Sequence, residues 1–380
     1  MDKRPEVSVI IVSYNCLPVL RLMLTSLRIS LEGIDGEVFV VDNASSDGTS
    51  EYLKEHYNWI TTIASTDNNG FSKANNIALS QCRGKVVLLL NPDTIISRTF
   101  VREIISHFEQ HPESGAVGVQ MVNGRGLYLR ESKRGYTDVQ TSFYKITGLW
   151  RFFRKSSKVN AYYMGHVDRD IDAKVPILSG ACMAFTHELL DKVGMFDESY
   201  FMYGEDIDLS WRMNMASEGN MYLGTKTILH FKGMSTPRKL KYILAFYKAM
   251  ELFARRYEFP KHNWFVNGVV LLGIKMGCLL GCLKCILLRI KDKFAKEYKP
   301  KKVTFVSTSS INRDAFALKN KDIVVYLTDD ISHIDAEVKH VVFDVEEDLN
   351  KALGFMRQHG KQHLYAFYSK SEDLVVPGDF

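Results

Sequence analysis

Both common phosphate-binding fingerprints are missing from this sequence: it contains no G-x-x-x-x-G-K-[ST] loop and no G-x-G-x-x-G turn. The chain is therefore predicted to be neither a P-loop protein nor a dinucleotide-binding protein. Internal repeats and low-complexity segments are also absent, and the composition, with 46% hydrophobic and 24% charged residues, is that of a globular protein. Disordered, collagen-like and coiled-coil chains are excluded.

Cysteine is scarce, and its spacing does not suggest a metal site or a disulfide framework. Of the six cysteines, Cys282 and Cys285 have C-x-x-C spacing, but they lie in an apolar run without a second pair. We expect all six to be reduced thiols in a reducing compartment. The N-terminus, Met1-Asp2-Lys3, is polar and unlike a signal peptide, so we expect a cytoplasmic chain unless a later segment tethers it.

A strong charge imbalance is lacking too, since 49 Lys and Arg against 44 Asp and Glu give a net charge of +5. No nucleic-acid partner is predicted. At 380 residues the chain is too long for one typical domain. We predict a first domain at residues 1–258, an apolar and basic helical segment at 259–302, and a small α/β domain of unknown role at 303–380.

The first third of the chain alternates short apolar strands with helices. Strands are predicted at residues 7–12, 37–41, 60–64 and 85–90, with helical patterns between them. Runs without polar alternation are typical of parallel strands that are covered on both faces. The order predicts an α/β fold with a doubly wound, mostly parallel sheet, whose ligands bind at the carboxyl ends of the strands.

Polar residues stand at these strand ends. Asp42 closes the second strand, where a carboxylate can accept a hydrogen bond from a nucleoside, although it could also cap the next helix. Asn69 and Lys73 lie at a helix N-terminus that suits a diphosphate, or they form an ordinary cap with a solvated lysine. Asp93 follows a buried strand and is a carboxylate of the kind that hard divalent cations prefer.

Two further groups occur later in the chain. Glu205 and Asp206, followed by Asp208, open a predicted helix. Crowding and burial could raise the pKa of one of these acids to suit a general base, or the acids could simply complement the helix dipole. His230 follows a predicted strand and could bind a metal, although a single histidine is more often structural.

The order and spacing of these groups resemble the family 2 glycosyltransferases of the GT-A fold. The matching segments are Ser13-Tyr14-Asn15, Asp42, Asn69-Gly70, Asn91-Pro92-Asp93, Ser179-Gly180-Ala181-Cys182, Gly204-Glu205-Asp206 and His230. The Asn-Pro-Asp form is most similar to the rhamnosyltransferase-like branch. The resemblance covers residues 7–255.

For the donor, the resemblance implies a nucleoside site and a diphosphate site. Ser13, Tyr14 and Asp42 would contact the nucleoside, and Asn69 and Lys73 would lie beside the diphosphate.

For the metal and the base, the resemblance implies further roles. Asp93 matches the last acid of the family's D-x-D motif and would bind Mg²⁺ or Mn²⁺, with His230 as a further ligand. Asn91 replaces the first acid, which leaves less negative charge for the metal. Asp206 matches the catalytic base of a Glu-Asp pair with Glu205.

The resemblance also implies the reaction: inverting transfer of a sugar from a nucleotide-diphosphate donor to a hydroxyl of a glycan or lipid-linked acceptor in cell-surface polysaccharide synthesis. It favours dTDP-rhamnose over a UDP-sugar as donor. Two alternatives stay open. A sugar-phosphate nucleotidyltransferase would need a Gly-rich basic loop after the first strand, and a non-catalytic, membrane-tethered scaffold would not need the acids.

The segment at residues 264–288 is long and apolar enough to span a membrane, but Lys275 stands in its middle. A pair of short interfacial helices hinged near Gly273 and Gly277 is one alternative, and a buried core helix is another. The basic residues from 289 to 302 would be attracted to an anionic leaflet. We therefore expect a peripheral or monotopic protein on the cytoplasmic face of the plasma membrane.

Overall fold

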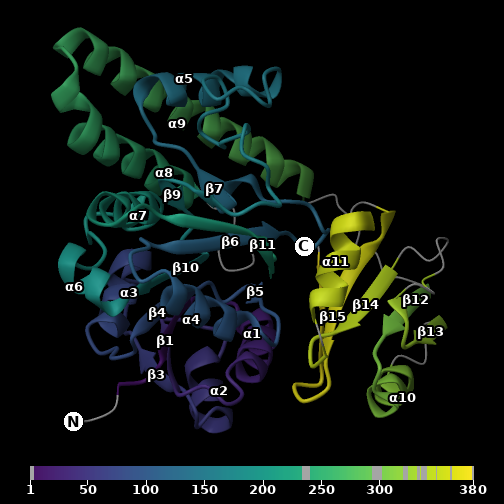
Figure 1. Ribbon diagram of the computed structural model, residues 1–380. Coiled ribbons are helices and arrows are strands. Elements are labelled where there is room, and N and C mark those ends of the chain that lie inside the picture. Colours follow the sequence, from purple (N-terminus) through teal and green to yellow (C-terminus); the bar gives the residue numbers. More distant parts are fainter. Residues whose placement is uncertain are drawn as a thin grey trace.

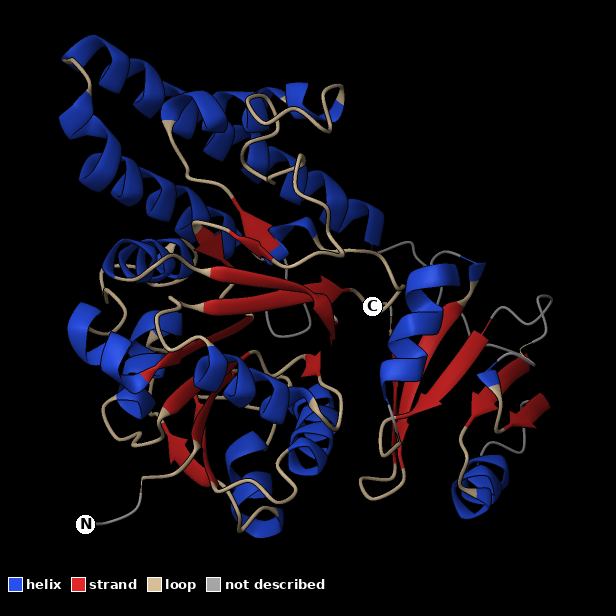
Figure 2. Ribbon diagram, viewed as in Figure 1, coloured by secondary structure: helices blue, strands red, loops and turns tan. Residues whose placement is uncertain are grey.

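The computed structural model describes residues 4–232, 240–292, 302–319, 324–331, 334, 340–347, 349–359 and 362–378. Within these residues the chain forms a large sheet flanked by helices, a helical hairpin, and a second, smaller sheet (Figure 1). Figure 2, with strands in red, shows the two main groups of strands apart from each other. The main group contains the predicted strand ends.

The main sheet has the strand order β3-β2-β1-β4-β10-β6-β11-β5, and β8 pairs with β11. The first four strands run parallel, as predicted. The bounds are β1 (Val7–Ser13), β2 (Gly36–Asp42), β3 (Thr61–Ala64), β4 (Val86–Leu90), β5 (Thr94–Ile95), β6 (Val117–Val122), β8 (Ala173–Lys174), β10 (Cys182–Thr186) and β11 (Met221–His230).

Both faces of this sheet are covered by helices, which explains the unbroken apolar strands. Val9 and Ile11 of β1 belong to a core that includes α1 (Leu17–Ser30), α2 (Thr49–His56) and α4 (Phe100–Gln110). Ile10 points to the other face. There it joins a core with α3 (Gly70–Leu79), α6 (His187–Val193) and α7 (Glu205–Ala216).

The sheet departs from the simple parallel pattern after β4, because β10 runs antiparallel to β4 and to β6. The apolar stretch that begins at residue 177 contains two short strands: β9 (Ile177–Leu178), which pairs with β7 (Lys133–Arg134), and β10. The chain leaves the ladder between them because Gly180 and Ala181 bond to site residues rather than to a neighbouring strand.

The irregular middle of the chain contains short elements: η1 (Arg130–Ser132), α5 (Val139–Thr147) and η2 (Leu149–Arg151). We call residues 139–165 the excursion. In Figure 1, α5 lies at the same upper end of the molecule as the helical hairpin.

The hairpin consists of α8 (Leu240–Phe253), the turns η3 (Ala254–Glu258) and η4 (Phe259–Lys261), and α9 (Trp264–Asp292), which packs back on α8. The predicted hinge in α9 is wrong, since the helix is unbroken. Gly277 instead lets the helix approach α8, where an added Cβ would lie 2.8 Å from Tyr247. Among the described residues, one helical stretch, Trp264–Leu283, has the length and composition to cross a membrane.

That stretch is 6% buried, so the alternative of a buried core helix is also wrong. The predicted basic segment continues beyond α9, and its residues 293–301 lie outside the described part of the chain.

The second sheet has the order β13-β12-β14-β15-β16. Its elements are β12 (Lys302–Val306), α10 (Ser310–Lys319), β13 (Val324–Thr328), β14 (His340–Asp344), α11 (Leu349–His359), β15 (Leu364–Ser369) and β16 (Leu374–Pro377). It shares a core with the main sheet, in which Leu22 of α1 and Phe231 after β11 pack with Phe367 of β15.

Candidate active site

The loops at the carboxyl ends of β1 and β2 are joined into one rigid rim. Ser13 and Asp42 are neighbours in the parallel register of these strands. Asn15 has a positive φ of 50°, and its side-chain Oδ1 accepts a hydrogen bond from the backbone N–H of Ser46 at 2.7 Å. Such a strained backbone persists where surrounding contacts fix it. The rim places Ser13 and Asp42 side by side, with Tyr14 half-buried beside them.

Asp42 is buried, and its Oδ1 accepts one hydrogen bond, from the backbone N–H of Ser45 at 3.2 Å. Burial raises the pKa of this carboxyl group above its usual range. The alternative that Asp42 caps the next helix is wrong, because α2 begins at Thr49 and Asp47 accepts the Thr49 N–H at 3.2 Å. The Asp42 carboxylate therefore keeps acceptor positions for a ligand.

The start of α3 is held from two sides. The Asn43 side chain accepts the N–H of Asn69 at 2.9 Å and donates to the carbonyl of Gly70 at 3.1 Å. Gly70 has a φ of +79°, and a Cβ there would lie 2.2 Å from the Phe201 carbonyl, so glycine is required. Lys73 is exposed one turn into α3. The structure thus brings Asn69 next to the Asp42 rim, and Lys73 follows one turn later on the surface of α3.

Asp93 is fully buried, yet neither of its carboxylate oxygens accepts a hydrogen bond. The nearest charged or polar partner is His230, whose Nε2 lies 3.3 Å from Asp93 Oδ1. The Nε2 also lies 3.5 Å from the side-chain amide of Asn91. An unsatisfied buried carboxylate is costly. Asp93 and His230 together form a pair that suits a cation.

No cluster of three or more His, Cys, Asp or Glu side chains capable of holding a metal occurs in the described residues. Asp93 and His230 can therefore supply two ligands, and further oxygen ligands would have to come from water or from a bound phosphate.

The acids at the start of α7 have different surroundings. Asp206 Oδ2 accepts hydrogen bonds from Arg134 and from the Gly180 N–H at 3.2 Å. Its Oδ1 accepts the Ile207 N–H at 2.9 Å. These contacts fix the orientation of the carboxylate. A Cβ on Gly180 would lie 3.1 Å from the Asp206 Cβ, so the glycine allows this approach.

Glu205 is buried, and its Oε2 has no hydrogen-bond partner. Burial, together with the neighbouring Asp206, raises the pKa of Glu205 to about 8. Burial therefore favours the neutral form of Glu205.

Asp208, the third acid, is fully buried and bound. Its Oδ2 accepts from Arg212 at 2.9 Å and its Oδ1 from the Tyr257 hydroxyl at 2.5 Å. Asp208 therefore joins α7 to the turn between α8 and α9, and its fully buried side chain is not available as a base.

A short segment connects the two centres. The Asn91 N–H donates to the Ala181 carbonyl at 2.9 Å, while Gly180 contacts Asp206. Residues 179–182 therefore connect two groups: the Asp93 and His230 pair, through Asn91, and the Asp206 carboxylate, through Gly180. Both groups lie at the edge of the sheet where the parallel strands end.

Arg134 is the residue that the sequence reasoning missed. It lies on β7, and its guanidinium is buried between Asp206 and the Leu178 carbonyl. The sequence showed Arg134 only as one cation among many in the irregular middle. An arginine beside a short strand carries no local signal of burial, so only the pairing of β7 with β9 reveals its contact.

The chain is similar to a protein family and to several characterised glycosyltransferases. Residues 8–194 match the model of a protein family described as Glycosyl transferase family 2. An N-acetylglucosaminyl-diphospho-decaprenol L-rhamnosyltransferase of Mycobacterium tuberculosis is 25% identical over 257 residues, covering 64% of this chain and 82% of that protein. A low-salt glycan biosynthesis hexosyltransferase of Haloferax volcanii is 27% identical over 214 residues, and the match covers 54% of this chain and 61% of that protein.

Among solved structures, the crystal structure of residues 1–349 of S. aureus TarS aligns with a TM-score of 0.45 and 20% identity. The alignment covers 71% of this chain and 70% of that chain.

Proposed function

Because the chain belongs to the family 2 glycosyltransferases, we propose that it transfers a sugar, with inversion, from a nucleotide-diphosphate donor to a hydroxyl acceptor during synthesis of a cell-surface glycan. The observation that carries this proposal is the single edge of the sheet that holds both the unsatisfied Asp93 and the oriented Asp206. The rhamnosyltransferase relative favours dTDP-rhamnose as donor, and a UDP-sugar is the second candidate.

The donor would bind along the rim. Ser13, Tyr14 and Asp42 would receive the nucleoside, with Asp42 accepting hydrogen bonds through its free acceptor positions. The diphosphate would lie toward the N-terminus of α3, where the helix dipole and the exposed Lys73 favour negative charge.

The Asp93 and His230 pair fits a divalent cation, since two buried oxygens lack partners and one imidazole nitrogen lies beside them. Asp93 and His230 would hold Mg²⁺ or Mn²⁺ together with diphosphate oxygens. The side-chain amide of Asn91 would contact the donor without adding negative charge to the metal site. A cation bound there would stabilise the negative charge that develops on the departing diphosphate.

Asp206 would act as the general base. Its carboxylate would take the proton from the acceptor hydroxyl as that oxygen attacks the anomeric carbon on the face opposite the leaving diphosphate. Arg134 and Gly180 hold the carboxylate in one orientation, so no reorganisation is needed during the reaction.

We place the enzyme at the cytoplasmic face of the plasma membrane, where a lipid-linked acceptor would be found. The exposed apolar surface of α9 supports this location, because Trp264, Leu279 and Leu280 are all more than half exposed. The sequence allowed a membrane-spanning helix, a pair of interfacial helices or a buried core helix. The unbroken, exposed α9 fits a single helix that spans the membrane or lies in its interface.

The test is a donor screen that measures released nucleotide, with dTDP-rhamnose and UDP-sugars, with Mg²⁺ or Mn²⁺, and with a chelator. We expect slow hydrolysis of one donor, stimulated by metal. Formation of a nucleotide-sugar from a sugar phosphate and a nucleoside triphosphate would instead indicate a nucleotidyltransferase. Inertness toward every donor, with a glycan acceptor present, would favour a scaffold.

A further inference from the structure

The tip of the excursion exposes two adjacent aromatic side chains. Phe152 is 83% exposed and Phe153 is 56% exposed, directly after η2. Isolated exposed apolar residues are common on soluble proteins, but a contiguous apolar patch usually marks an interaction site. The two phenylalanines need an explanation that the active site does not give.

The same segment has a charge of one sign. Residues 139–165 contain five Lys and Arg and no Asp or Glu. Four of the cations flank the exposed phenylalanines: Arg151, Arg154, Lys155 and Lys158, all exposed. Aromatic side chains beside cations are the composition of a surface that enters the headgroup region of an anionic bilayer.

The base of the excursion is firmly held, so the exposed tip is not a loose loop. Trp150 packs edge-on against Tyr163 with ring centroids 4.9 Å apart, and Lys145 lies 3.5 Å from the ring centroid of buried Tyr162. The Tyr162 carbonyl accepts the N–H of Gly135, the residue after Arg134. The tip is thereby connected to the segment that orients Asp206.

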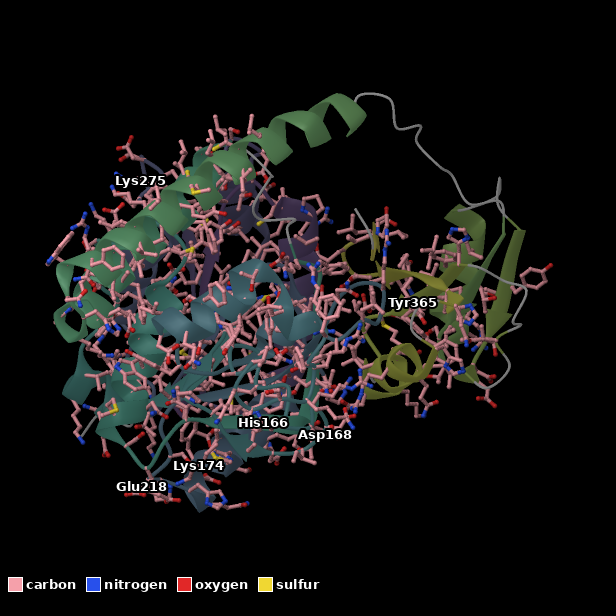
Figure 3. All side chains as sticks on the ribbon, turned by 90° about the horizontal axis from the view of Figure 1, so that it is seen from above. His166, Asp168, Lys174, Glu218, Lys275 and Tyr365 are labelled. Carbon is pink, nitrogen blue, oxygen red and sulfur yellow. The ribbon has the colours of Figure 1, made fainter. Side chains whose placement is uncertain are left out.

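The position of the excursion also fits a flat surface. In Figure 1, α5 and the turns after it lie at the same upper end of the molecule as α9. Figure 3, which views that end from above, shows α9 with the exposed Lys275 along one edge, and His166 and Asp168, just after the excursion, toward the opposite edge. One bilayer could touch both α9 and the excursion.

We propose that the excursion is a second membrane-contacting element: Phe152 and Phe153 insert into the interface of an anionic bilayer, and the flanking cations bind lipid phosphates. This inference rests on the membrane location proposed above. It adds that the bilayer is held beside the segment that carries Arg134, which would present a lipid-linked acceptor to Asp206.

Limited trypsin digestion of the full chain on vesicles tests the proposal. The protein is floated with neutral phosphatidylcholine vesicles and with vesicles that also contain phosphatidylglycerol, and cleavage after Arg151 and Lys158 is followed by mass spectrometry. We expect cleavage at these sites to be about tenfold slower on the anionic vesicles. Lys54 is exposed on α2, at the lower end in Figure 1, and should be cleaved equally on both.

Two variants make the test specific. The double substitution Phe152→Ser/Phe153→Ser should restore rapid cleavage at Arg151, whereas Met215→Ser, which changes another exposed apolar side chain, should not. Arg154→Gln/Lys155→Gln should reduce the difference in cleavage rate between the two kinds of vesicle, while the matched charge change Arg28→Gln/Lys85→Gln, which keeps the Lys54 reference site, should leave that difference intact.

Three outcomes would overturn the proposal. The chain could float with vesicles while Arg151 and Lys158 are cleaved equally fast on both, which would leave α9 as the membrane contact. Arg151 could stay protected from trypsin in the Phe152→Ser/Phe153→Ser variant, which would mean that the fold of the protein, and not membrane insertion of the two phenylalanines, slows the cleavage. The chain could fail to float at all, which would refute the membrane location as well. Sugar transfer measured in detergent would still test the proposed activity separately.

Discussion

At the scale of single residues, three acids within four positions differ because their partners differ. Asp206 is oriented by Arg134 and Gly180, Glu205 is buried with no hydrogen-bond partner on its Oε2, and Asp208 is bound by Arg212 and Tyr257. Burial without compensation favours the neutral form of a carboxyl group, and an adjacent guanidinium favours the charged form. What separates Asp206 from the other two is access: its side chain is 17% exposed, whereas that of Asp208 is fully buried and Glu205 is also buried, so Asp206 is the acid that an acceptor hydroxyl can reach.

This difference predicts opposite results for two isosteric substitutions. Asp206→Asn should lower the rate of sugar transfer by a factor of about 10²–10⁴ while donor affinity stays unchanged, because the general base is lost. Glu205→Gln should retain most of the transfer rate, because it mimics the protonated side chain. Single-turnover transfer and nucleotide titration would measure the two effects. If Glu205→Gln lost most of the transfer rate and Asp206→Asn lost little, Glu205 rather than Asp206 would be the general base.

The Asp93 carboxylate leads to a second prediction at this scale. Asp93→Ala should weaken the binding of metal and of the nucleoside diphosphate together, because both would share the site. His230→Ala should have the same effect more weakly. Calorimetric titration of dTDP or UDP, with Mn²⁺ and with a chelator, would measure both. If the chelator leaves the wild-type affinity and rate unchanged, cationic side chains such as Lys73 must stabilise the leaving group instead.

At the scale of elements, the hairpin shows how glycine can serve packing rather than bending. Gly277 and Gly281 of α9 face Tyr247 and Ile243 of α8, where added Cβ atoms would lie 2.8 and 3.2 Å away. Gly273, one turn earlier, has no atom within 4 Å of such a Cβ. The glycines at 277 and 281 therefore allow close approach of two helices, while Gly273 has no such contact.

The contrast between these positions gives a matched pair of substitutions. Gly273→Ala should stabilise α9 by about 1 kcal/mol, the difference in helix propensity between glycine and alanine. Gly277→Ala should lose that gain, and Gly277→Leu should lower the unfolding temperature, because the side chain collides with Tyr247. Thermal unfolding in detergent would be measured for each. Gly273→Leu is the control for the leucine substitution, and equal unfolding temperatures for Gly273→Leu and Gly277→Leu would contradict the packing of α8 on α9.

At the scale of the whole molecule, the second sheet is docked on the first rather than tethered beside it. Glu372, after β15, accepts hydrogen bonds from Arg21 of α1 at 2.8 Å and from Tyr57 at 2.5 Å. Phe231, the residue after His230, packs edge-on against Phe367 with centroids 5.4 Å apart. The second sheet therefore supports the segment that carries His230.

The Glu372 contacts can be tested by a charge-neutral substitution. Glu372→Gln should reduce the free energy of unfolding by about 2 kcal/mol, since a hydrogen bond to a charged group contributes about 1.5–3 kcal/mol and this one is partly exposed. The control Glu55→Gln changes a carboxylate that is 78% exposed and should have little effect. Urea unfolding monitored by circular dichroism would compare the two. Equal midpoints would mean that the docking contact adds no stability.

The sequence by itself determined the local elements and the order of the site residues. Unbroken apolar runs predicted β1, β2 and β4 to within a residue or two at each end, because strands buried on both faces need no polar alternation. Since parallel strands end at one edge, the sequence also predicted which polar residues would be neighbours, such as Ser13 and Asp42.

Only the tertiary structure decided the contacts between distant segments. The burial of Arg134 against Asp206, the docking of Phe367 on Phe231 and the approach of Gly277 to Tyr247 join residues 30 to more than 100 positions apart. Each depends on which surfaces meet after the strands and helices have formed, and no local periodicity encodes that meeting. The different surroundings of Glu205, Asp206 and Asp208 follow from these contacts as well, because burial and partners are set by the tertiary structure rather than by residue type.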